Sequence, residues 1–143
     1  MNAYLDSSVL LREILEQTPR LREWYDLIVG VTSELARVEC LRTVDRLRHE
    51  GKATDENVTE VQARVDRLFK RLLVAPLDVD VLTRASAPLP TSLSTLDAIH
   101  LATAHLYRAT QPADEPPVYF ATFDLALAKA AHATGFRVLG ATL

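Results

Sequence analysis

The chain has 143 residues, of which 48% are hydrophobic and 24% charged, and its formal net charge is −3. This length fits one domain, residues 1–143, with a substantial core, and no apolar run approaches the roughly 20 residues of a membrane span. The charge argues mildly against a nucleic-acid binder, and the single Cys40 excludes an internal disulfide and a cysteine-based zinc cluster. No basic segment precedes the first apolar residues, so we expect a cytoplasmic protein rather than a secreted one.

Short strands alternate with helices along the first half of the chain. Residues 2–5 are predicted to form a strand that runs into Asp6, followed by a helix over 7–16. Thr18-Pro19 is predicted to open a second helix that continues through Leu27, and residues 28–31 form the next strand. Two longer amphipathic helices follow, one from residue 34 to Gly51 and one from the cap Thr54 to about residue 72.

The second half repeats this alternation. We expect a strand within 72–77, a helix over 78–87, a connector at 88–90, an apolar helix over 94–107 and a loop at 110–117. A strand at 118–121, a helix over 125–134 that Gly135 ends, and a last strand at 136–139 complete the chain. The pattern predicts an α/β fold of three layers, α/β/α, with a short central parallel sheet of four to five strands and helices on both faces.

Four acids occupy positions that suggest a site. Asp6 and Asp124 come directly after predicted strands, while Glu39 and Asp97 lie within amphipathic helices. The ends of parallel strands meet at one edge of a sheet, where open α/β sheets keep their active sites. Acids that converge there would repel one another unless a cation lay between them, and this arrangement suits Mg²⁺ or Mn²⁺ and phosphate ester chemistry.

Each acid also has a purely structural interpretation. Asp6 and Asp124 would act as helix N-caps. Asp97 would complete a capping box with Ser94. Glu39 would pair with Arg42 or Arg46 on its own helix.

Four short stretches around these acids occur in order at plausible separations. They are residues 4–8, 33–39 and 96–102, and residues 121–124 followed by an alanine-rich helix and Gly135. Together they resemble the PIN-domain ribonucleases of the VapC toxin type over essentially the whole chain. The resemblance implies a PIN-like fold and a metal-dependent endoribonuclease that leaves 5′-phosphate and 3′-hydroxyl ends. Its catalytic and metal-binding residues would be Asp6, Glu39, Asp97 and Asp124, with Mg²⁺ or Mn²⁺ as cofactor.

Three further polar residues near these acids keep two interpretations each. Ser7 and Thr122 would contact the acids or serve as turn hydroxyls. His100 would face the site or lie in the core, and the core position is the more common one for a histidine on an apolar helix.

The resemblance also implies partners: an RNA substrate, a cognate antitoxin protein whose tail enters the acidic groove, and a second copy of the chain joined through the helices around residues 34–72. The alternative function is a catalytically weak PIN-fold module that binds RNA or protein. A receiver-type phosphotransfer domain fits poorly, because Ser7-Ser8 rather than a second acid follow Asp6.

Overall fold

Five parallel strands form the centre of the molecule, which a computed structural model describes over residues 1–143. Their spatial order is β3-β2-β1-β4-β5. The chain builds outward from β1 through β2 to β3, then returns to the other side of β1 for β4 and β5. The order therefore reverses between β1 and β4, which is where open α/β sheets bind ligands beyond the carboxyl ends of their strands.

Strands and helices alternate as the sequence predicts, with one exception described below. The strands are β1 (Asn2–Leu5), β2 (Val29–Ser33), β3 (Leu73–Ala75), β4 (Val118–Thr122) and β5 (Arg137–Gly140). The helices are α1 (Ser7–Ile14), α2 (Glu34–His49), α3 (Asp55–Phe69), α4 (Val79–Ala85), α5 (Thr95–Ala109) and α6 (Leu125–Ala133), with one short 3₁₀ turn, η1 (Trp24–Asp26).

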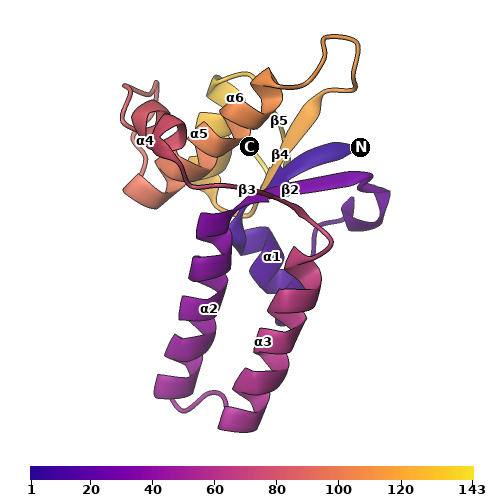
Figure 1. The fold of residues 1–143 in the computed structure, drawn as a ribbon, viewed down its shortest axis with the longest axis vertical. Helices are drawn as coiled ribbons and strands as arrows, with labels where there is room; N and C mark the ends of the chain where they lie inside the picture. Colours follow the sequence, from indigo (N-terminus) through magenta and orange to yellow (C-terminus); the bar gives the residue numbers. More distant parts are fainter.

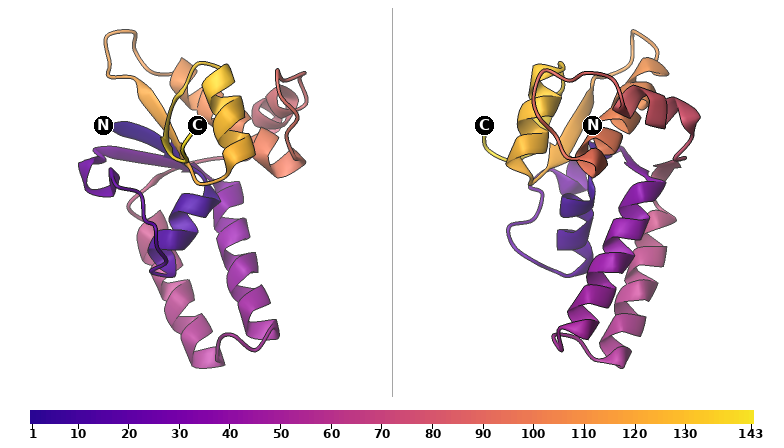
Figure 2. Two further views of the ribbon diagram at one scale, coloured as in Figure 1. Left: turned by 180° about the vertical axis from the view of Figure 1, so that it is seen from behind. Right: turned by 90° about the vertical axis from the view of Figure 1, so that its left-hand side faces the viewer.

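Helices cover both faces of the sheet, which confirms the predicted three-layer α/β/α fold. Helices α1, α2 and α3 lie on one face and α4, α5 and α6 on the other (Figure 1), and the two views of Figure 2 show the same division. Alternate residues of β1 supply the two cores, because side chains on a strand point to opposite faces in turn. Ala3 and Leu5 pack on the α1 side, and Tyr4 packs with Phe120 and Leu101 on the α5 side.

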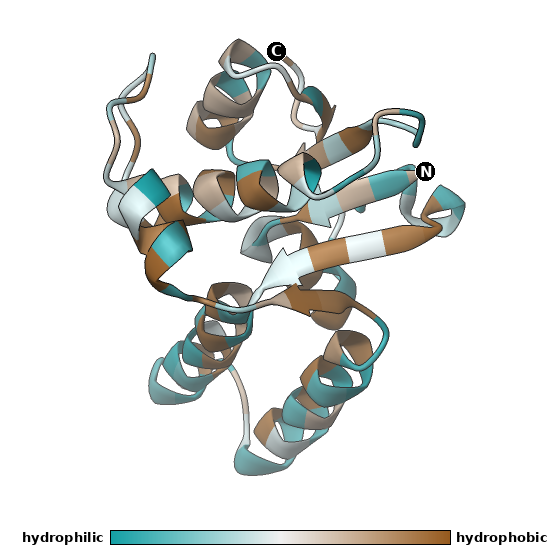
Figure 3. Cartoon of the chain, turned by 45° about the horizontal axis from the view of Figure 1, so that its top comes forward, coloured by the Kyte–Doolittle hydropathy of each residue, from teal (hydrophilic) through white to brown (hydrophobic).

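Helices α2 and α3 form an antiparallel hairpin that extends away from the sheet (Figure 1). Ser33 caps α2, and Thr54 caps α3 in a capping box with Asn57, so both helices begin where local signals predict. Figure 3 shows many hydrophilic residues along both helices and hydrophobic ones along β2. None of the helices in the structure is long and apolar enough to cross a membrane.

The predicted helix from Thr18 to Leu27 is wrong. Only the single turn of η1 forms in this segment, and the rest is irregular. Leu21 is buried in the core beside α1, and Trp24 packs at its edge. The segment is too short for a helix to persist on its own propensity, so the packing of these two side chains decides its path.

Candidate active site

Asp6 lies at the carboxyl end of β1 and is the N-cap of α1, so its predicted structural interpretation is confirmed. Only 3% of the residue is exposed. Its Oδ1 atom accepts hydrogen bonds from Ser8 Oγ at 2.7 Å and from the Val9 backbone N–H at 3.2 Å. Its Oδ2 atom accepts one from Thr122 Oγ1 at 2.7 Å, which joins the ends of the two strands that flank the sheet's reversal point.

The Asp6 carboxyl is buried among neutral donors. Burial raises its pKa, while the hydrogen bonds from Ser8 and Thr122 and the nearby His100 act in the opposite direction. No lysine or arginine pairs with it within 4 Å. An ionised Asp6 is therefore a buried negative charge without a full positive partner, which is costly in a protein interior.

The loop between β4 and α6 is fastened to Asp6 through two hydroxyls. Thr122 Oγ1, besides donating to Asp6, accepts from the Asp124 backbone N–H at 2.9 Å. Ser8 Oγ accepts from the Phe123 backbone N–H at 2.9 Å. Thr122 thus contacts an acid and also serves as a turn hydroxyl, the two interpretations left open for it, whereas Ser8 rather than Ser7 contacts Asp6.

Asp124 caps α6 at the rim of this region. Its Oδ1 atom accepts from the Leu127 backbone N–H at 2.8 Å, and the residue is exposed to solvent. The predicted helix-cap role of Asp124 is therefore present. The backbone N–H of Asp124 donates to the Thr122 hydroxyl, which in turn donates to Asp6.

Glu39 faces His100 rather than the arginines of its own helix. Its Oε1 atom lies 2.5 Å from His100 Nε2, and the other ring nitrogen of His100, Nδ1, lies 2.8 Å from Tyr4 Oη. The structural alternative, pairing of Glu39 with Arg42 or Arg46, is wrong, because these arginines pair with Asp45 and Glu50. His100 is a buried core residue, as its structural interpretation predicts, and it also contacts the candidate site acid Glu39.

Asp97 completes the predicted capping motif with Ser94. Ser94 Oγ donates to Asp97 Oδ2 at 2.6 Å and accepts from the Asp97 backbone N–H at 3.3 Å. Asp97 is partly exposed at the first turn of α5, and His100 follows it by three residues. Residues at this spacing lie on the same side of a helix, so Asp97 and His100 share one side of α5.

Asp6 and Glu39 share buried neighbours, but the four acids do not form a closed ligand set. Burial, with smaller contributions from the charges of Glu39 and Asp6, raises the pKa of the Cys40 thiol to about 12, so the two carboxylates act on one buried neighbour. Burial likewise raises the pKa of Tyr4, to which Asp6 and Glu39 also contribute. With the side chains placed as they are, no group of three or more Asp, Glu, His or Cys residues is arranged to hold a metal ion.

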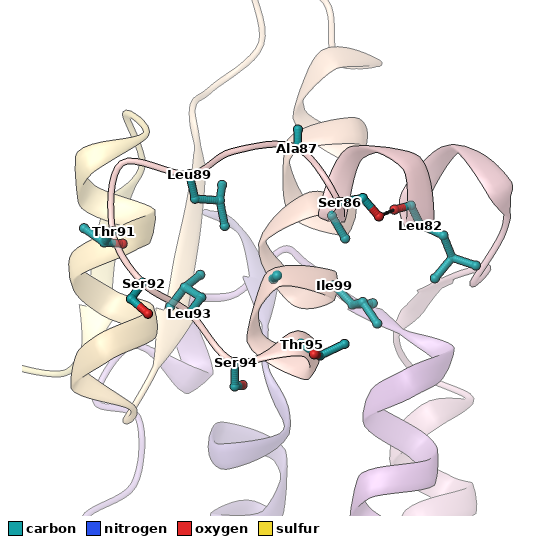
Figure 4. Close-up of a pocket in the computed structure, with 12 residues that line it drawn as sticks. Leu82, Ser86, Ala87, Leu89, Thr91, Ser92, Leu93, Ser94, Thr95 and Ile99 are labelled. Carbon is teal, nitrogen blue, oxygen red and sulfur yellow. Dashed lines mark hydrogen bonds between the residues drawn. The ribbon is translucent and has the colours of Figure 1, made fainter.

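A pocket of about 470 Å³ borders the start of α5 (Figure 4). It lies between the end of α4, the 86–93 connector and the first turns of α5, and its lining mixes apolar side chains such as Leu89 and Ile99 with several hydroxyls. Thr91 Oγ1 is buried there without a hydrogen-bond partner. Ser94, the cap that holds Asp97, also lines this pocket, which therefore adjoins the candidate site.

A parallel sheet with acids at its reversal point and on the flanking helices defines a recognisable class of protein. The PIN domain family matches residues 3–133, and the chain belongs to this family. The resemblance drawn from the four sequence stretches is thereby confirmed.

Named relatives and solved structures agree with this membership. Ribonuclease VapC47 of Mycobacterium tuberculosis (strain CDC 1551 / Oshkosh) is 32% identical over 140 residues, which cover 93% of this chain and 92% of the relative. Ribonuclease VapC35 of the same strain is 32% identical over 144 residues, covering 95% and 94%. The fold is similar to that of M. tuberculosis VapC20, a sarcin-ricin loop cleaving toxin, with a TM-score of 0.64, 18% identity and coverage of 94% and 96%. It is also similar to VapBC2 of Rickettsia felis bound to a promoter DNA fragment, with a TM-score of 0.66, 11% identity and coverage of 96% and 97%.

Proposed function

We propose that this chain is an endoribonuclease that hydrolyses RNA phosphodiester bonds, and that it is the toxin of a toxin–antitoxin pair acting in the cytoplasm. The observation that carries the proposal is Asp6, a buried carboxylate at the reversal point of the sheet with no lysine or arginine partner. Membership of the PIN domain family and relatives named as VapC ribonucleases support this function.

The metal ligands in this proposal are Asp6, Glu39, Asp97 and Asp124. A donor set made only of carboxylate oxygens suits a hard divalent cation, Mg²⁺ or Mn²⁺. Glu39 Oε2, Asp97 Oδ1 and Asp124 Oδ2 make no hydrogen bond within the protein, so each of these three acids keeps an oxygen available. Because no three acids converge as they are placed, binding requires side-chain rotation, which the partly exposed Asp97 and the exposed Asp124 permit.

The chain's own residues have distinct parts in this reaction. Ser8 and Thr122 hold both oxygens of Asp6, which fixes its carboxylate in one orientation. The exposed side of Asp97 and Asp124 leaves room for a phosphodiester and for the water that attacks it. A divalent ion, when bound, supplies a lowered pKa for that water and stabilises charge on the phosphate.

Metal removal tests the proposal directly. We expect cleavage of purified total RNA to stop after exhaustive treatment with EDTA and to return on addition of Mg²⁺ or Mn²⁺, because the four acids alone cannot activate water. EDTA saturated beforehand with Mg²⁺ is the matched control and should leave cleavage intact. Cleavage that continues after chelation at an unchanged rate would contradict metal dependence.

One observation favours the alternative of a catalytically weak RNA- or protein-binding module. The acids are not arranged as a ligand set in the structure, so an inactive chain with the same fold would look similar. Tight binding of many RNAs with no new 5′ ends in a transcriptome-wide map of cleavage sites would establish this alternative over the nuclease.

We also propose a cognate antitoxin that places a cationic side chain among the acids. Toxin–antitoxin complexes occur among the structural neighbours, including one from Klebsiella pneumoniae with a TM-score of 0.60 and 16% identity. A carboxylate cluster without a lysine or arginine of its own is a suitable receptor for an arginine. Growth inhibition by this chain that no neighbouring gene product relieves would count against the antitoxin.

A homodimer through the helices around residues 34–72 is the second proposed assembly, but not every apolar residue of these helices is available for it. Val65 and Phe69 of α3 pack in the core beside α1. Three exposed large apolar side chains remain on α2, the edge strand β3 and α4: Val38, Leu73 and Val79, at 56%, 55% and 75%. A monomer mass by light scattering at micromolar concentration would refute the dimer.

A further inference from the structure

His100 is a buried residue that hydrogen-bonds through both ring nitrogens. It is 1% exposed, and its Nε2 atom lies 2.5 Å from Glu39 Oε1 while its Nδ1 atom lies 2.8 Å from Tyr4 Oη. These two contacts span 61 and 96 residues of sequence, so folding alone brings the three side chains together.

The direction of the contact with Glu39 follows from chemistry. An ionised carboxylate only accepts hydrogen bonds, so His100 Nε2 carries a proton and its N–H donates a hydrogen bond to Glu39. This holds for the neutral ring, in which Tyr4 Oη–H donates to Nδ1, and equally for the charged ring, in which Nδ1–H donates to Tyr4 Oη. In either state Tyr4 fixes the ring plane and the ring fixes Glu39.

Tyr4 is a rigid anchor for this chain of contacts. It is fully buried in β1, and its ring packs against Phe120 with 5.2 Å between ring centroids. Its close packing leaves the hydroxyl little freedom to move. The position of His100 Nε2 is therefore set by the central strand of the sheet.

The three residues lie on the three elements that carry Asp6, Glu39 and Asp97. Tyr4 precedes Asp6 by two residues on β1, Glu39 lies on α2, and His100 follows Asp97 by three residues on α5. Each contact therefore couples two of the proposed ligand-bearing elements. No other histidine contacts an acid of the candidate site.

We infer that His100 is a positioning residue for Glu39, with Tyr4 as its support; this inference rests on the proposed metal-dependent function. His100 holds Glu39 Oε1 and leaves Oε2, which makes no hydrogen bond within the protein, available as the ligand atom. Glu39 has a flexible side chain that is 22% exposed and has no arginine or lysine partner, so without His100 it would sample several rotamers. Hydrogen-bonding partners of metal ligands commonly contribute 10–100-fold to metal affinity or activity.

The test compares Mn²⁺ binding by isothermal titration calorimetry in matched variants. We expect His100→Leu to weaken Mn²⁺ binding about 10–100-fold. His100→Gln, whose side-chain amide can still donate to Glu39, should recover part of that loss. Tyr4→Phe keeps the Nε2 contact and removes its support, so it should weaken binding by less than His100→Leu. His105→Leu, the same exchange five residues along α5 at a residue that contacts Arg108 and no acid, should leave Mn²⁺ affinity unchanged.

A second readout does not depend on the metal. Nitrogen NMR shifts of the His100 ring should show a protonated Nε2 at neutral pH, and Glu39→Gln should change them. Equal Mn²⁺ affinity for wild type, His100→Gln and Tyr4→Phe, together with an unprotonated Nε2, would overturn the inference even if His100→Leu fails to fold. If wild type binds no Mn²⁺ at all, the proposed metal site fails; if Asp6→Asn abolishes binding and the His100 variants do not weaken it, only the role of His100 fails.

Discussion

Asp6→Asn should lower the rate of RNA cleavage by at least about 100-fold while leaving the fold intact. Several kcal/mol of transition-state stabilisation is the usual contribution of a bound divalent ion, and each 1.36 kcal/mol is a tenfold change in rate. Stability should not fall with activity, because burial already raises the pKa of Asp6 and so disfavours its charged form in the folded state. The two measurements are cleavage kinetics and the melting temperature of each variant.

Asp114→Asn is the matched control for this substitution. Asp114 lies exposed in the loop that leads into the amino end of β4, whereas the candidate site lies at the carboxyl ends of the strands, so the same change of charge there should leave cleavage unchanged. Undiminished cleavage by Asp6→Asn would remove the observation on which the proposed function depends. A large drop in melting temperature that accompanies the loss of activity would show instead that Asp6 is chiefly a helix cap.

Gly140→Ala should be strongly destabilising and should also disturb the candidate site. Gly140 has a φ of +92°, and a Cβ there would lie 2.6 Å from the backbone oxygen of Thr122. We expect about 1–2 kcal/mol from the left-handed backbone and a further 1–3 kcal/mol from the overlap. Because Thr122 Oγ1 holds Asp6, its displacement should lower cleavage as well. Urea denaturation and cleavage kinetics measure the two effects.

Gly51→Ala separates these two contributions. Gly51 also has a positive φ, +70°, but a Cβ there would meet nothing within 4 Å. Its alanine variant should therefore show the backbone cost alone and retain full cleavage activity. Equal stability losses for the two variants would mean that β5 moves away from Thr122 without difficulty.

Local signals in the sequence predicted most of the fold. The caps Ser33 and Thr54, the apolar spacing of α2 and α3, and the stop at Gly135 each act within a few residues, so sequence alone reveals them. The segment 18–27 failed because its path depends on where Leu21 and Trp24 pack, which is a property of the folded core. Family resemblance named the four acids, and the contact between Asp6 and Thr122 was anticipated among two alternatives.

The supports of the acids could not be predicted in the same way. Glu39 had arginines at helical spacing on its own helix, and that local pairing was a reasonable expectation. Its actual partner, His100, is 61 residues away in the sequence, and Tyr4, the other partner of His100, is 96 residues from His100. No periodicity connects residues so far apart. Ser8 had a local signal, a hydroxyl two residues after a helix-capping acid, which would have distinguished it from Ser7.

Because Cys40 is buried, the reactivity of its thiol reports how often the folded protein opens. The thiol lies on α2 with no exposed surface, directly after Glu39, so an alkylating reagent reaches it only when that helix separates from the strands. The rate of alkylation under native conditions therefore measures how often the molecule opens, and a tightly bound inhibitor should slow it. A fluorescent dye attached to a cysteine newly introduced at an exposed position would, for the same reason, leave the native thiol unlabelled.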